Sequence, residues 1–248
     1  MAGLLLAFVV ILAAIQQFSS KRLEKRRQKV RRQQKKLRQQ ERQLRQMRDR
    51  ISSVLGVRSR LMKRLKKRFS TVGGDIRFDD ATGSIRLGSS ILFEEGSAKL
   101  TPRGKRKLRR YMPIYFEALL GDSDLREHVD RIIVQGHANS NYSGPGGKRA
   151  AYLFNLELSQ DRAFSAMKYI LRQRLGSEYK VRNLLQASGF SFSRKIYKTV
   201  IGEDGKPKEV EDFQASRRIE IRFRLKGERA LKRLRDMFEG TLDGANGG

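Results

Sequence analysis

The chain opens with an apolar segment that gives way abruptly to a long polar one. Residues 1–18 are apolar apart from Gln16 and Gln17, and no acidic residue occurs before Lys21. A membrane-spanning helix needs about 17 to 25 mostly apolar residues, so this pattern predicts a transmembrane helix over residues 1–20. A cleaved signal peptide is the alternative, but it requires a positively charged start and small residues at a cleavage site.

Beyond this segment, apolar residues recur at every seventh position in a polar background. The row consists of Leu23, Val30, Leu37, Leu44 and Ile51. Such a repeat lines one side of a helix and is typical of a coiled-coil seam. The positions three residues later are Arg26, Gln33 and Gln40, then Met47, Val54 and Leu61, so the seam is half polar near the membrane segment. We therefore expect a basic helical linker over residues 21–69, and a homodimer that pairs along it.

No Pro or Gly lies between Leu4 and Leu55, so the two helical patterns could form one rod that ends at Gly56. The breaker-rich residues 70–74 mark the next boundary, and a globular domain is predicted over residues 70–226. Residues 227–248 read as a short basic helix and a flexible tail.

Within the domain, strands and helices alternate. We expect strands at 84–87, 90–93 and 132–134, and a hairpin over 196–210. One helix is expected over 101–120, with Thr101 as N-cap and Pro102 at its first position, and another is expected to begin at Ser159. Residues 217–225 alternate between apolar residues and a charged, water-exposed face of Arg218, Glu220 and Arg222. The pattern predicts an α+β fold, a two-layer sandwich with helices on one face of a mixed sheet.

Positive charge is concentrated in the predicted linker. The formal net charge is +29, and residues 21–68 alone hold 22 Lys and Arg against Glu24, Glu41 and Asp49. Such a block attracts anionic lipid or nucleic acid. The alternative is a solvated helix face without a specific partner.

Candidate chemistry is sparse. The chain has no cysteine, which excludes disulfides and thiolate metal sites, and its only histidines are His128 and His137. We find no catalytic triad, no phosphate-binding loop and no paired catalytic carboxylates. The sequence therefore predicts that the protein is not an enzyme and has no metal or cofactor.

Four segments resemble, in order, the motifs of OmpA-like, MotB-type peptidoglycan-binding domains. They are residues 93–100 (Phe-Glu-Glu-Gly-Ser-Ala-Lys-Leu), 133–137 (Ile-Val-Gln-Gly-His), 155–163 (Asn-Leu-Glu-Leu-Ser-Gln-Asp-Arg-Ala) and 217–221 (Arg-Arg-Ile-Glu-Ile). Four ordered motifs are far more specific than one short motif. The resemblance implies that the domain binds the diaminopimelate of a peptidoglycan stem peptide.

The resemblance also implies the binding residues. In the family an Asp takes the ammonium of diaminopimelate and an Arg takes its carboxylate, as suits charge-assisted hydrogen bonds. Arg162 matches that Arg, Asn155 matches the Asn before it, and Arg217 or Arg218 matches a closing Arg pair. For Arg162, a surface position or a salt bridge within the domain is the alternative reading.

Two departures concern the ammonium side of the site. The usual Gly-His/Tyr-Thr-Asp reads Gly136-His137-Ala138-Asn139, so the neutral Asn139 stands where the family has the Asp. Its amide can accept a hydrogen bond, but loss of the charge costs about 1 kcal/mol. The next loop is also lengthened by residues 142–149.

The order of membrane helix, linker and domain resembles the B subunits of ion-driven motor units, especially those of Zorya antiphage systems. This implies a MotA/ZorA-like membrane partner, a single-pass protein of the bacterial inner membrane, and a periplasmic C-terminal domain. The basic linker by itself favours the cytoplasmic side for the domain.

B subunits of this kind carry an Asp in the membrane helix, and residues 1–20 contain no Asp. Residues 1–5 resemble the stretch that directly follows that Asp. We therefore expect the true start of the protein to lie upstream of Met1.

Overall fold

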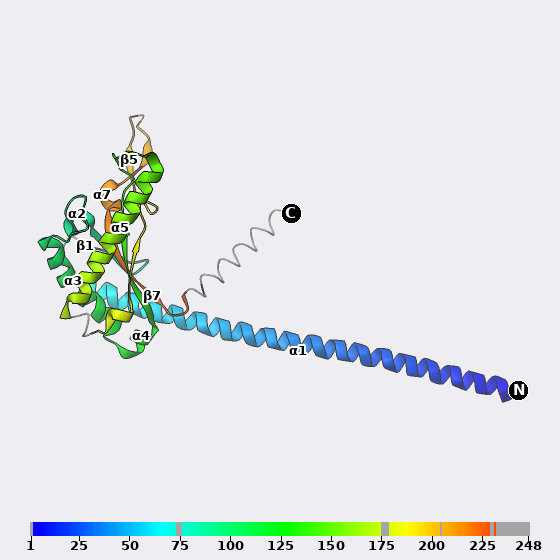
Figure 1. Cartoon of the computed structure of the whole chain (residues 1–248). Helices are drawn as coiled ribbons and strands as arrows, with labels where there is room; N and C mark the ends of the chain where they lie inside the picture. Colours follow the sequence, from blue (N-terminus) through cyan, green and yellow to red (C-terminus); the bar gives the residue numbers. More distant parts are fainter. Residues whose placement is uncertain (1, 73–75, 175–178, 204, 229–230, 232–248) are drawn as a thin grey trace. The chain divides into compact units, whose positions relative to one another are not determined.

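The computed structural model describes residues 2–72, 76–174, 179–203, 205–228 and 231, with the side chains of 2–16 and 18–21 left out (Figure 1). The chain divides into two compact units, Met1–Ser53 and Val54–Gly248. The predicted basic helix and tail at 227–248 fall almost wholly outside the described residues.

The first unit consists of helix α1 (Ala2–Phe69) up to Ser53. Its seam residues Leu23, Val30, Leu37 and Leu44 are 50–62% exposed, so the described residues leave them largely uncovered. Pairing along this seam therefore stays a prediction. Among the described residues, no helix has a stretch long and apolar enough to cross a membrane. The span predicted at 1–20 lies, except for Gln17, outside the residues whose side chains are described.

Helix α1 does not end at Gly56. It continues to Phe69, and its last turns supply Val57, Leu61, Leu65 and Phe69 to the core of the second unit. A Cβ added at Gly56 would meet nothing within 4 Å, so no neighbour forces a break there. The expected domain boundary at residue 70 stays a prediction, and the helix does end where the breaker-rich segment begins.

The second unit is built on a five-stranded sheet with the order β1-β2-β7-β3-β4. The strands are β1 (Ile76–Asp79), β2 (Ser84–Gly88), β3 (Val129–His137), β4 (Leu185–Gly189) and β7 (Arg218–Leu225). Strands β3 and β4 are parallel and the other neighbours are antiparallel. The predicted mixed sheet of an α+β fold is confirmed.

Helices α3 (Pro102–Leu120) and α5 (Gly147–Arg172) bury their apolar residues in one core with the sheet. Ile219, Ile221 and Phe223 of β7 are fully buried in this core. Short helices α2 (Ser89–Leu92), α4 (Ser123–His128), η1 (Val181–Asn183) and α7 (Phe213–Ser216) join the strands, and β5 (Tyr197–Ile201) with β6 (Pro207–Glu211) forms the predicted hairpin.

The structure confirms some of the predicted element boundaries and corrects others. Thr101 caps α3 as predicted, because its hydroxyl accepts from the N–H of Gly104 at 2.8 Å. The strand predicted at 90–93 is wrong: residues Ser89–Leu92 form a helical turn that buries Leu92. Helix α5 begins at Gly147, twelve residues before the predicted Ser159. Its first turns carry exposed apolar residues and so lack an amphipathic pattern.

The charged face of β7 is buried, which corrects the prediction of a face exposed to water. Arg218 and Glu220 are each 7% exposed. The segment after β4 covers this face: Phe190 stacks on His137 with ring centroids 5.2 Å apart, and the Arg194 guanidinium lies 3.9 Å from the Phe190 ring centroid. A non-local segment therefore encloses a layer of charges that the strand alone would expose.

Candidate functional site

The candidate site lies where parallel strands β3 and β4 end beneath α5. Two glycines allow this close approach: a Cβ on Gly136 would lie 1.9 Å from the carbonyl oxygen of Ser159, and one on Gly189 would lie 2.5 Å from the nitrogen of Gln160. The Ser159 hydroxyl also accepts from the N–H of Ser191 at 3.0 Å. Helix α5 is thus held at fixed depth over the strand ends.

Arg162 lies on the sheet-facing side of α5. Its side chain is buried, its Nε donates to the carbonyl of Ser97 at 2.9 Å, and its guanidinium carbon lies 5.5 Å from the centroid of the Phe93 ring. Among the described residues, no carboxylate lies within 4.0 Å of this guanidinium. Arg162 is therefore a buried cation without a counter-ion in the part of the chain that the structure describes, which corrects the reading of it as a salt-bridged surface residue.

Arg217 adds a second positive charge to the same place. It follows the short helix α7, which Asp212 caps by accepting from the N–H groups of Gln214 and Ala215, both at 3.0 Å. Burial and then the nearby charge of Arg217 lower the pKa of Arg162 from its ordinary value. Two guanidinium groups that repel each other in a partly desolvated site favour a bound anion.

Asn139 lies two residues beyond β3 and is buried. Its Nδ2 donates to the carbonyl of Phe213 at 3.2 Å, and none of the described residues donates to its Oδ1. The next residue, Ser140, donates from its N–H (3.1 Å) and its hydroxyl to the carboxylate of Glu211, which also pairs with Lys195 at 3.4 Å. The Asn139 oxygen is therefore held in place as a neutral acceptor.

Asn155 lies seven residues before Arg162 on the same face of α5. It is buried, and its Nδ2 donates to the carbonyl of Ala151 at 3.0 Å. The amide group is thus turned back onto its own helix.

The closing Arg pair is divided between the two faces of the sheet. While Arg217 lies near Arg162, Arg218 pairs with Glu220 at 3.4 Å and donates to the carbonyls of Arg194 (3.2 Å) and Ser216 (3.3 Å). Glu220 also lies 3.7 Å from Arg86 and accepts from the Ser84 hydroxyl at 2.9 Å. Arg218 therefore belongs to a structural charge cluster, and Arg217 is the member placed at the candidate site.

His137 lies beside this cluster and is buried. Neither ring nitrogen has a hydrogen-bond partner among the described residues, and the carboxylate of Glu220 is 3.9 Å away. Burial, followed by the charges of Arg218, Arg194 and Arg86, lowers the pKa of His137 to about 3. The ring is thus neutral at ordinary pH.

Sequence reasoning missed three groups of the site. Phe93 and Ser97 belong to the first motif, but only the fold shows that they contact Arg162. Glu211 lies 71 residues from Ser140, and no local signal links the two. An alternation argument could have separated Arg217 from Arg218, since consecutive strand residues face opposite sides.

Comparison with known proteins supports the resemblance. No protein-family profile matches the chain. Zorya protein ZorB from Escherichia coli is 26% identical over 163 residues, which cover 64% of this chain and 65% of ZorB. The chain thus spans less than two thirds of that relative's length. The resemblance to an OmpA/MotB-type domain of the ZorB kind is confirmed.

Solved structures give weaker likenesses. A MotB-like protein from Desulfovibrio vulgaris superposes with a TM-score of 0.48 at 18% identity, covering 72% of this chain and 96% of the other. The cell wall anchor of the T6SS from Pseudomonas aeruginosa gives a TM-score of 0.42 at 20% identity, covering 67% and 98%.

Proposed function

We propose that this chain is a peptidoglycan-binding B subunit of the stator type, and that Arg162 and Arg217 hold a carboxylate of the stem peptide. The buried guanidinium of Arg162, unpaired among the described residues, carries this proposal. A desolvated cation without a partner is unfavourable in the free protein, and a bound carboxylate would satisfy it through two parallel hydrogen bonds. The Phe93 ring and the Ser97 carbonyl fix the guanidinium plane in advance.

Asn139 would accept a hydrogen bond from the ammonium of diaminopimelate. Its Oδ1 is free of donors from the described residues, while its Nδ2 is anchored on Phe213. Because Glu211 is engaged by Ser140 and Lys195, it does not replace the charge that Asn139 lacks. We therefore expect the site to bind the carboxylate end of diaminopimelate more strongly than its ammonium end.

The similarity to ZorB supports a place in a Zorya-type antiphage motor complex. In that arrangement residues 1–20 anchor the chain in the inner membrane, a MotA/ZorA-like subunit binds beside them, and the domain binds the cell wall in the periplasm. The exposed seam of α1 would pair two copies. These finer roles are part of the proposal.

Retention of the full chain on purified cell-wall sacculi tests the binding function. We expect wild-type protein to sediment with sacculi, and Arg162→Ala to reduce the retained fraction at least tenfold, since it removes a charge-assisted bidentate contact. Arg149→Ala is the matched control, because Arg149 is an exposed arginine on the same helix. No retention of wild-type protein, or equal retention of both variants, would contradict the proposal.

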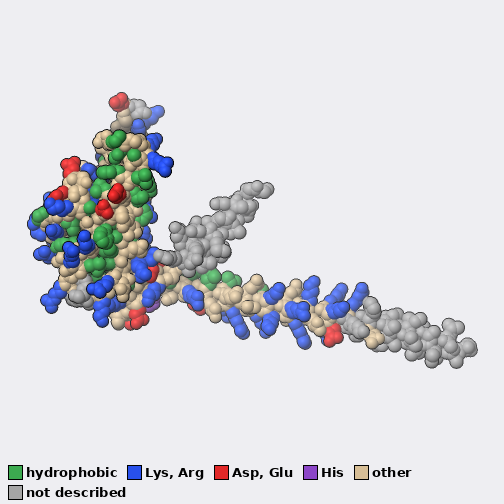
Figure 2. All heavy atoms as spheres, in the orientation of Figure 1, with side chains coloured by type: hydrophobic (Ala, Val, Ile, Leu, Met, Phe, Trp, Pro, Cys, Tyr) green, Lys and Arg blue, Asp and Glu red, His purple; other side chains and the backbone are tan. Residues whose placement is uncertain are grey.

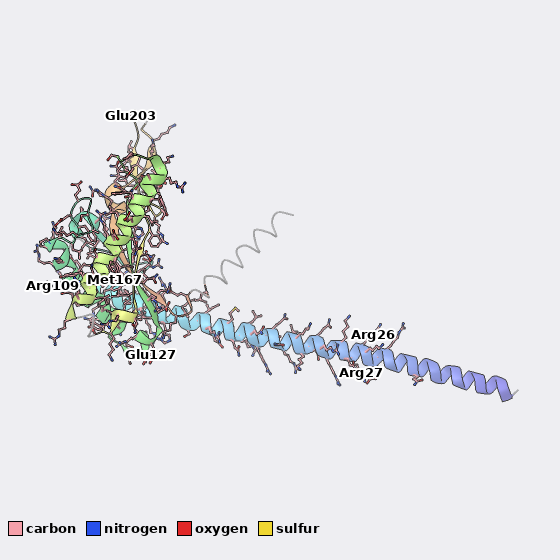
Figure 3. The ribbon with its side chains drawn as sticks, viewed as in Figure 1. Arg26, Arg27, Arg109, Glu127, Met167 and Glu203 are labelled. Carbon is pink, nitrogen blue, oxygen red and sulfur yellow. The ribbon has the colours of Figure 1, made fainter. Side chains whose placement is uncertain are left out.

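A second candidate function is binding of nucleic acid or anionic lipid by residues 21–68. Lys and Arg side chains project on several sides of the described part of α1 (Figure 2), and Arg26 and Arg27 point away from the helix (Figure 3). A shallow groove along the helix is lined by Arg31, Gln34, Lys35, Arg38, Gln39 and Arg42. DNA binding that weakens steeply with salt and is lost when residues 21–53 are deleted would favour it over the cell wall.

A further inference from the structure

An aromatic pair lies beside the candidate site and has no role in the core. Phe154 is 50% exposed, and its ring contacts that of Tyr142 with centroids 5.6 Å apart. Tyr142 comes from the lengthened loop after β3 and is fixed there by a hydrogen bond from its hydroxyl to the carbonyl of Pro145 at 3.3 Å. Figure 2 shows hydrophobic side chains exposed on the face over which α5 runs in Figure 1.

This pair is aligned with the proposed carboxylate site. Phe154, Leu158 and Arg162 are spaced at i, i+4 and i+8, so they form a row that turns about 80° around α5, from the exposed Phe154 to the buried Arg162. Leu158, between them, is half-buried. Eight residues of helix correspond to about 12 Å. A ligand that runs along α5 from Arg162 would therefore pass Leu158 and reach the aromatic pair about 12 Å away.

We propose that the Tyr142–Phe154 pair binds a sugar ring of the glycan strand whose stem peptide Arg162 holds. This inference rests on the proposed function. In peptidoglycan the diaminopimelate is the third residue of a peptide attached to a sugar, so the sugar lies about three residue lengths, ~10 Å, away. That distance matches the separation along α5. An aromatic ring offers a flat apolar face that suits the C–H face of a pyranose.

The surrounding loop also fits a sugar. Residues 141–147 read Asn-Tyr-Ser-Gly-Pro-Gly-Gly, and all are exposed except the half-buried Tyr142. Tyr, Ser, Asn and Gly are the residues that antibody loops use for adaptable hydrogen bonding beside aromatic contacts. Hydroxyl and N-acetyl groups of an amino sugar are ligands of that kind. The lengthened loop thus supplies polar groups around the aromatic platform.

The test compares two probes on the full chain by calorimetry: the free tripeptide L-Ala–D-Glu–diaminopimelate, and the same tripeptide on its N-acetylglucosamine–N-acetylmuramic acid disaccharide. We expect wild-type protein to bind the disaccharide form about fivefold more tightly. Phe154→Ala and Tyr142→Ala should each remove most of this difference and leave tripeptide affinity unchanged. Phe154→Trp should keep or increase it.

Two variants serve as controls. Phe164→Ala removes a phenylalanine that is 47% exposed and lies two residues after Arg162, on the opposite side of α5, and it should leave both affinities unchanged. Arg162→Ala should weaken both probes. Sugar binding by the Tyr142–Phe154 pair is overturned if wild-type protein binds both probes equally. It is also overturned if Phe154→Ala changes the oligomeric state and leaves the preference for the disaccharide form intact. In both cases the proposed carboxylate site at Arg162 is unaffected. If wild-type protein binds neither probe, both proposals fail.

Discussion

Gly136 faces the carbonyl oxygen of Ser159 so closely that a Cβ at this position would lie 1.9 Å from it. Strand β3 and helix α5 can meet only because this residue has no side chain. We expect Gly136→Ala to lower the free energy of unfolding by about 2 to 3 kcal/mol, because α5 must move outward. Thermal or denaturant unfolding measures this.

Gly56 provides the matching control for that substitution. It lies inside α1, and an added Cβ meets nothing within 4 Å. Gly56→Ala should therefore stabilise the helix by up to about 1 kcal/mol. Equal effects of the two substitutions would show that the contact between Gly136 and Ser159 does not limit packing.

The end of α1 is predicted to be an integral part of the globular unit. Leu61 is fully buried, whereas Leu55, on the same helix, is 56% exposed. Leu61→Ala should cost about 3 kcal/mol of unfolding free energy through a core cavity, and Leu55→Ala should change it by less than about 0.5 kcal/mol. If Leu61→Ala left the unfolding transition unchanged, the helix end would not belong to the domain core.

Asn139→Asp is expected to have opposite effects on binding and stability. A carboxylate beside the ligand ammonium should tighten binding of the free tripeptide about fivefold. The same change removes the hydrogen bond from Nδ2 to the Phe213 carbonyl, which should cost about 1 kcal/mol of stability. Calorimetry with the tripeptide and denaturant unfolding separate the two effects; unchanged affinity would count against an ammonium contact at Asn139.

Arg162→Met is expected to stabilise the free protein while abolishing cell-wall retention. The substitution keeps an apolar stem over the Phe93 ring and removes a buried charge that has no counter-ion among the described residues. The melting temperature should rise by a few degrees. A lower melting temperature would indicate that Arg162 serves the fold and not a ligand.

His137 should make stability depend on pH above the range where carboxylates titrate. Burial, followed by the charges of Arg218, Arg194 and Arg86, lowers its pKa to about 3 in the folded protein, against about 6.5 when unfolded. The unfolded chain thus binds the proton first, so stability is full above about pH 6.5 and falls as pH decreases toward about 3. The total loss is on the order of 5 kcal/mol.

The variant His137→Phe tests this dependence, since a phenyl ring can keep the stacking on Phe190. Between about pH 6.5 and pH 5, its unfolding free energy should be nearly constant while that of the wild type declines. Parallel curves for the two proteins would assign the decline to other groups.

The elements that the sequence predicted correctly have signals within a few residues. Thr101 and Pro102 mark the start of α3 because capping is local, and the alternation of Ile219, Ile221 and Phe223 reflects the pleat of one strand. The motifs also led to Arg162 and Asn139, which the fold places near the same strand ends.

The features that were missed depend on distant residues. The charged face of β7 is covered by Phe190 and Arg194, which no pattern within the strand can reveal. Likewise, the helical turn Ser89–Leu92 begins where the N–H of Ser89 donates to the carbonyl of Arg217, far along the chain. Contacts of this kind arise only after the sheet has formed.

Because Arg217 and Arg218 lie on two different faces of the sheet, the composition of the candidate site depends on the register in which β7 pairs with β3. Arg218 lies opposite His137 in the pairing of β7 with β3. A slip of one residue would exchange the two arginines, put Ile219 among the charges and force Glu220 into the core. The carboxylate site that we propose would therefore not form on a misaligned sheet, and burial of the salt cluster favours the one register in which Arg217 lies near Arg162.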